Sequence, residues 1–76
     1  MTLDELQPGG SGKIVAVHGR GATRRRFLDL GLTPQTIVSV RKVAPLGDPI
    51  EISLRGFELT LRKTEAKNIQ IEEVSS

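Results

Sequence analysis

The 76-residue sequence contains no cysteine, tryptophan or tyrosine and only two phenylalanines. Without cysteine the chain has no disulfide bond, thiolate metal site, iron–sulfur ligation or cysteine nucleophile, and a reducing compartment is the natural environment. With so few aromatic residues, the interior must consist mainly of Val, Ile and Leu, which leaves little room for an enclosed substrate pocket. We therefore expect a protein that is not an enzyme and has no catalytic residues.

Long apolar runs are also missing. No segment approaches the ~20 apolar residues that a membrane-spanning helix needs. The first residues have neither the basic region nor the apolar run of a signal peptide. We therefore expect a soluble, cytoplasmic chain. At this length we expect one domain, residues 1–76, that buries roughly 60% of the surface of its unfolded chain.

Residues 49–62 predict a β-hairpin whose register can be derived from the sequence. Apolar and polar residues alternate on both sides of Arg55-Gly56, which form a two-residue loop. This loop places the alternating apolar residues on one face as three opposed pairs, namely Leu54 with Phe57, Ile52 with Leu59 and Ile50 with Leu61. A slip by one residue would send half of these side chains to water. The pattern thus predicts antiparallel strands with one apolar face.

The rest of the chain predicts three more strands and one helix. The strands are expected at residues 13–18, 37–43 and 68–73, and short helical turns at 3–6 and 65–67. The helix is expected at residues 23–30, with Thr23 as N-cap. Gly31 suits the left-handed position after the helix, where Leu32 would reach back to Phe27 in a Schellman motif.

Five short strands can bury a core in a chain of this size only if the sheet curls on itself, which also protects its edges. We therefore expect a mainly β fold, a small five-stranded barrel with one α-helix between the first two strands. Barrels of this size include SH3-like and OB-like forms. Fold class alone assigns no function, because both forms have many functions.

The charge is uneven along the chain. Residues 1–43 carry seven Lys and Arg against three Asp and Glu, whereas residues 44–76 carry four against six. The basic excess is concentrated in four arginines, Arg20, Arg24, Arg25 and Arg26. Three interpretations are open, namely a phosphate-facing patch, a contact with anionic lipid, and a solvated helix face. A nucleic-acid platform would normally add aromatic side chains for stacking, and only Phe27 is near, where the helix pattern places it in the core.

Metal binding, cofactor binding and catalysis have little support in the sequence. His18 is the only histidine, and a lone imidazole makes a poor ferrous site. Glu72 and Glu73 are adjacent but point to opposite faces of a strand. The glycine-rich segments 9–12 and 19–21 are too short and wrongly patterned for a phosphate-binding loop. We expect no metal site and no cofactor.

Several short motifs follow one another along the chain, namely Arg26-Phe-Leu-Asp-Leu-Gly-Leu-Thr-Pro34, Leu46-Gly-Asp-Pro-Ile50, Gly56 with Leu59 and Leu61-Arg62, and finally Ala66 with Ile69. Their order and spacing resemble the bacterial ferrous iron transport protein A (FeoA) family over nearly the whole chain. One position departs from the pattern, because many relatives have Gly where Gln35 stands.

The resemblance implies an SH3-like barrel that acts as a small cytosolic, non-enzymatic accessory protein of bacterial ferrous iron uptake. Its implied partner is a large membrane ferrous iron transporter with its own GTP-binding domain, which would recruit the chain to the inner face of the membrane. A related domain occurs at the end of iron-dependent repressors. The family offers no established catalytic residues to transfer.

An adaptor needs exposed residues of uneven chemistry, and the sequence offers two candidate surfaces. One is the helix with Arg24 and Arg25, whose positive charge near the helix N-terminus is unfavourable for the macrodipole. The other is the loop with Leu46 and Asp48, although Gly, Asp and Pro there are also what a turn requires. Two alternative functions are a nucleic-acid-binding small barrel and a transition-metal-sensing domain related to the repressors. Self-association is left open.

Overall fold

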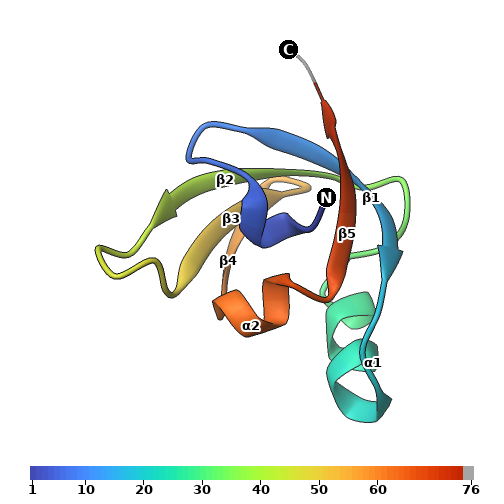
Figure 1. Cartoon of the computed structure of the whole chain (residues 1–76). Coiled ribbons are helices and arrows are strands. Elements are labelled where there is room, and N and C mark those ends of the chain that lie inside the picture. Colours follow the sequence, from blue (N-terminus) through green and yellow to red (C-terminus); the bar gives the residue numbers. More distant parts are fainter. Residues whose placement is uncertain (75–76) are drawn as a thin grey trace.

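The computed structural model describes residues 1–74, so the last two residues of the expected domain lie outside the described residues. Every predicted strand and helix is present (Figure 1). In chain order the elements are η1 (Leu3–Glu5), β1 (Ser11–Val17), α1 (Gly21–Asp29), β2 (Ile37–Val43), β3 (Ile50–Leu54), β4 (Phe57–Leu61), α2 (Lys63–Ala66) and β5 (Ile69–Val74). The predicted boundaries of the middle three strands match the structure closely.

The five strands form one antiparallel sheet in the order β4-β3-β2-β1-β5. Bulges in β1, between Ile14 and Ala16, and in β2, between Val40 and Lys42, interrupt the register. Bulges bend the strand that carries them and increase its twist, so the sheet curls (Figure 1). The result is a small, partly open barrel with α1 between its first two strands, which confirms the predicted fold class.

The register of the β3–β4 hairpin is the predicted one, with Leu54 opposite Phe57 and Ile50 opposite Leu61. Arg55 and Gly56 have φ values of 48° and 85°, as expected for the turn that joins twisted strands through two residues. All six apolar residues share one face, as predicted, but they are not all buried in the core. Phe57 is 44% exposed and Leu59 only half-buried, because β4 is an edge strand with a neighbour on one side only.

The helix begins earlier than predicted. Its N-cap is Arg20, not Thr23, and no side chain caps it. Gly19 and Gly21, both with positive φ, turn the chain sharply, so the helix already begins at Gly21. Its C-terminus matches the prediction: Leu32 N–H donates to the Phe27 carbonyl at 3.0 Å and Gly31 N–H to that of Leu28 at 3.1 Å. These two bonds define a Schellman motif.

The core lies inside the curled sheet and is aliphatic apart from Phe27. Phe27 and Leu32 enter it from α1 and the segment after it, and Leu3 and Leu6 from the N-terminal turn. The remaining buried apolar residues are Ile14, Val17, Val38, Val40, Ile50, Ile52, Leu54, Leu61, Ala66, Ile69 and Ile71. Because Phe27 is buried in this core, it fixes which face of α1 packs against the sheet and which face carries the exposed arginines.

The turn after α1 contains a strained residue. Gln35 has a φ of 80° and follows Pro34 in a turn closed by a 3.1 Å bond from Thr36 N–H to the Thr33 carbonyl. A residue with positive φ at this position of a turn favours glycine. Gln35→Gly is therefore expected to raise the free energy of unfolding by about 1 kcal/mol, measured by urea denaturation. Gln35→Ala keeps Cβ and is the control, so equal stability of the Gly and Ala variants would contradict the strain.

Candidate partner-binding surface

The two arginines predicted to bind a partner lie on the exposed side of α1 but differ in their contacts. Arg24 Nε donates to the carbonyl of Val17 at 3.1 Å, which ties the first turn of the helix to the end of β1. Arg25 lines a shallow surface hollow together with Ala22, Asp29 and other residues of α1. Among the described residues Arg25 makes no hydrogen bond or ion pair, whereas part of the Arg24 side chain serves the fold.

Leu46 and Asp48 lie in the connection between β2 and β3, and their environments also differ. Leu46 is 96% exposed, by far the most exposed large apolar residue in the described part of the chain. Asp48 Oδ1 accepts a hydrogen bond from the backbone N–H of Lys63 at 2.9 Å. Lys63 is the first residue of α2, whose early N–H groups lack partners within the helix. Asp48 thus has a structural contact that the sequence did not reveal.

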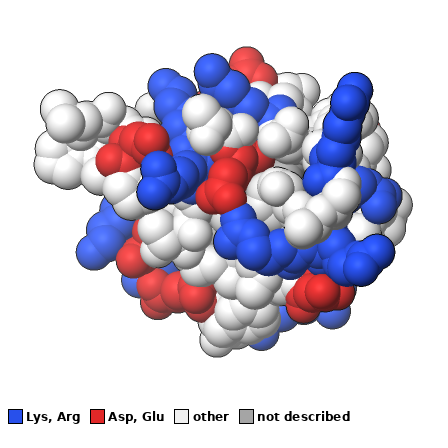
Figure 2. All heavy atoms as spheres, turned by 90° about the horizontal axis from the view of Figure 1, so that it is seen from below, with Lys and Arg blue, Asp and Glu red and all other residues white. Residues whose placement is uncertain are grey.

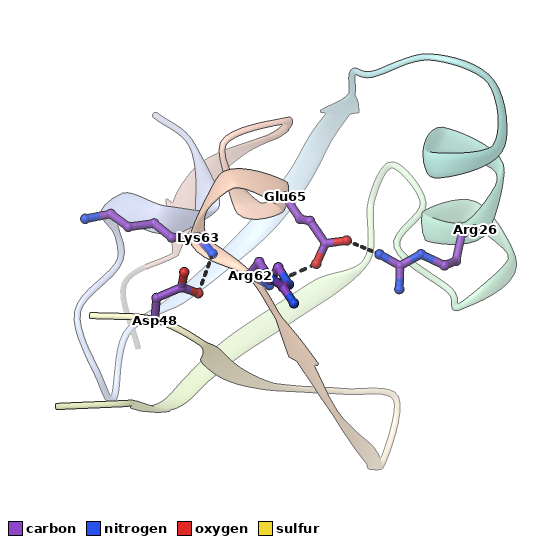
Figure 3. A network of polar contacts seen from close by, with 5 residues as sticks. All are labelled: Arg26, Asp48, Arg62, Lys63 and Glu65. Carbon is purple, nitrogen blue, oxygen red and sulfur yellow. Dashed lines mark hydrogen bonds and ion pairs between the residues drawn. The ribbon is translucent and has the colours of Figure 1, made fainter. Parts of the chain in front are cut away.

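Helix α2 joins the two candidate surfaces. Glu65 forms an ion pair with Arg26 of α1, and its Oε1 accepts the Arg62 backbone N–H at 2.9 Å. Figure 3 shows this chain of contacts from Arg26 through Glu65 to the start of α2, where Asp48 meets Lys63. The sequence did not single out Glu65 as a candidate, although a Glu at the third position of a helix often caps the helix N-terminus. These contacts link α1, α2 and the connection between β2 and β3.

The side of the molecule that carries both helices is rich in positive charge. Viewed from below, Lys and Arg cover much of this side, with carboxylates between them (Figure 2). The basic residues on α1 and α2 and at their caps are Arg20, Arg24, Arg25, Arg26, Arg62, Lys63 and Lys67. Phe27 is fully buried, so it offers no stacking platform for a base beside these cations.

The described residues contain no cluster of three or more His, Cys, Asp and Glu that could hold a metal ion. His18 is exposed, and its Nε2 lies 3.2 Å from Oε1 of Gln70. Within residues 1–74, no helix combines the length and the apolar character that crossing a membrane requires.

Solved structures place the chain among small SH3-like barrels. The FeoA-like protein of Clostridium acetobutylicum has a TM-score of 0.91 at 34% identity, over 100% of this chain and 88% of that one. The FeoA protein of Chlorobium tepidum has a TM-score of 0.92 at 40% identity, over 99% and 71%. Stenotrophomonas maltophilia FeoA, solved with zinc and described as a prokaryotic SH3 domain protein, has a TM-score of 0.85 at 28% identity, over 95% and 89%.

The sequence comparisons identify the family. The model of the FeoA domain matches residues 1–73, so the chain belongs to the FeoA family. A curated relative is the Fe(2+) transport protein A/Fe(2+) transporter FeoB fusion protein of Porphyromonas gingivalis, 37% identical over 76 residues. The match covers all of this chain but only 9% of that protein. A manganese-dependent transcriptional repressor shares the fold at 16% identity, with a TM-score of 0.87 over 97% of this chain and 36% of that one.

Proposed function

We propose that the chain is a small cytosolic, non-enzymatic accessory protein of bacterial ferrous iron uptake that binds a FeoB-type membrane transporter at its GTP-binding domain. The fusion protein of P. gingivalis carries this proposal, because it joins a relative of the whole chain to a transporter in one polypeptide. Fusion raises the effective concentration of two units that act together. Where the two units are not fused, the affinity of the accessory protein for the transporter would recruit it to the inner face of the membrane.

The exposed residues on the helix side support binding as the mode of action. Leu46 is almost fully in water, and burying such a side chain against a partner contributes about 1.5–3 kcal/mol. Arg25 projects from a helix anchored in the core, and arginine is enriched in interfaces. We propose Leu46 and Arg25 as the main contacts, with Arg24 and Asp48 beside them.

We expect Arg25→Glu to weaken binding to the purified GTP-binding domain of a FeoB-type transporter about tenfold, measured by isothermal titration calorimetry. The melting temperature should change little, because Arg25 has no hydrogen bond or ion pair in the described structure, and the gain at the helix dipole and the repulsion by Asp29 are both small and opposite in sign. Arg24→Glu should lower both affinity and stability, because it also removes the bond to Val17.

Lys42→Glu is the matched control, since it makes the same charge change at an exposed position of β2. Equal losses from the Arg25 and Lys42 variants would mean that only overall charge matters and would reject the α1 surface. Leu46→Ala tests the loop in the same assay and should leave stability within about 0.5 kcal/mol of the unmodified chain. No binding by the unmodified chain in any nucleotide state would reject the proposed function itself.

A further inference from the structure

The two edges of the sheet, β5 and β4, differ in how they are covered. The outer edge of β5 is covered by the N-terminus, where Thr2 pairs with Gln70 and Ile71 N–H donates to the Met1 carbonyl at 2.8 Å. Figure 1 shows the N-terminal segment beside β5. Among the described residues, β4 pairs with β3 alone. The chain itself therefore covers one edge at Gln70 and Ile71, whereas the other edge has no strand partner among the described residues.

The register of the hairpin identifies the backbone groups at the open edge. In an antiparallel pair, alternate residues direct N–H and C=O toward the same neighbour. Leu54 and Phe57 flank the two-residue turn and bond to each other, so the intervening residues Glu58 and Thr60 point their backbone groups outward. Their two N–H and two C=O groups have no backbone partner within residues 1–74.

The apolar side chains of β4 are incompletely covered on the same edge. Phe57 and Leu59 face inward, yet Phe57 is 44% exposed and Leu59 half-buried. A strand added beside β4 would cover both. Edge strands usually carry Pro or Lys to prevent such pairing, and β4 has neither. Its one charged residue, Glu58, lies with its Oε2 3.8 Å from Nε of Arg41, which offsets part of that charge.

We propose that a second copy of this chain adds its own β4 antiparallel to this edge and forms a symmetric dimer. The self-complementary register places Glu58 opposite Thr60 of the second copy and Leu59 opposite its own equivalent. Each Glu58–Thr60 pair then exchanges two hydrogen bonds, so the four outward groups of each copy are satisfied at once. This register also covers Phe57 and Leu59 in both copies.

Charge favours a second copy as the occupant. In this register no two like charges lie directly opposite each other, because Glu58 faces the neutral Thr60, although the Glu58 residues of the two copies are diagonal neighbours. If the pairing continues one residue beyond β4, Arg62 of the second copy lies diagonally opposite Glu58, and its long side chain can reach the Glu58 carboxylate. Arg62 has an extended backbone, with φ of −73° and ψ of 150°, and so continues the line of β4. Arg62 of the second copy and Arg41 of the same copy thus offset the repulsion between the two Glu58 carboxylates.

Two substitutions at Thr60 should shift the dimer in opposite directions. Thr60→Glu places a carboxylate opposite Glu58 twice per dimer and should weaken association about tenfold. Thr60→Lys places an ammonium group there and should strengthen association by a similar factor. Sedimentation velocity over a concentration series up to the millimolar range measures both against the unmodified chain. Thr60 is exposed, so neither variant should change the fold.

Thr60→Pro provides an independent test, because it removes an N–H that points away from β3. It should abolish the dimer while the melting temperature falls only slightly. Amide hydrogen exchange at Glu58 and Thr60 should slow as the concentration of the unmodified chain rises. A chain that stays monomeric at millimolar concentration would overturn the proposal. So would Glu and Lys variants that shift association in the same direction, which would place the contact on another surface.

Discussion

Phe27→Ala is expected to lower the free energy of unfolding by about 3–5 kcal/mol. Phe27 is 0% exposed and is the one aromatic side chain of the core. It joins α1 to the sheet, and the guanidinium of Arg26 lies 5.4 Å from the centre of its ring. A chain of this size has a total stability of roughly 4–11 kcal/mol. The variant should therefore have a much lower urea midpoint, and at the lower end of this range it should be close to its unfolding midpoint at room temperature, as measured by circular dichroism and urea denaturation.

Phe57→Ala is the matched control for this prediction, because it removes the same side chain from an edge position that is 44% exposed. It should cost about 1 kcal/mol, since less apolar surface returns to water and little cavity remains. Similar losses for the two variants would contradict the position of α1 over the core. They would also mean that Phe57 is buried as the alternation in the sequence predicts.

Leu61→Ala is expected to cost about 2–5 kcal/mol and Leu59→Ala only about 1–2 kcal/mol. The two leucines lie two residues apart on the same face of β4, so the sequence pattern treats them alike. Leu61 is 1% exposed, whereas Leu59 is only partly buried against the core. Both variants replace a leucine by alanine in the same strand, so the difference in strand propensity between the two residue types cancels when their free energies of unfolding are compared.

Urea denaturation of both leucine variants, with equal m-values, would measure this difference. Equal destabilisation would show that β4 is covered along its whole length. If the difference disappears only at high protein concentration, the cover is intermolecular, as the proposed dimer requires. The leucine pair therefore tests the edge of the barrel and its occupancy in one series.

The candidate surface was predicted only in part. Arg25 and Leu46 are exposed as an adaptor requires, and their residue types and neighbours in the sequence suggest this. The contact of Asp48 with Lys63 and that of Arg24 with Val17 had no sequence signal. The Asp48 contact joins segments 15 residues apart in the chain, and its geometry depends on how α2 packs beside the β2–β3 connection.

Taken alone, the sequence determines the β3–β4 register, the C-terminal end of α1 and the number of strands. These features depend on neighbouring residues: alternation sets the faces of a strand, and Arg55-Gly56 and Gly31 supply the positive φ that their turns require. Tertiary structure alone decides which strand becomes an edge, and therefore why Phe57 is exposed while Phe27 is buried. Burial depends on which distant segments cover a residue, and the chain closes the β5 edge with its N-terminus while leaving β4 open.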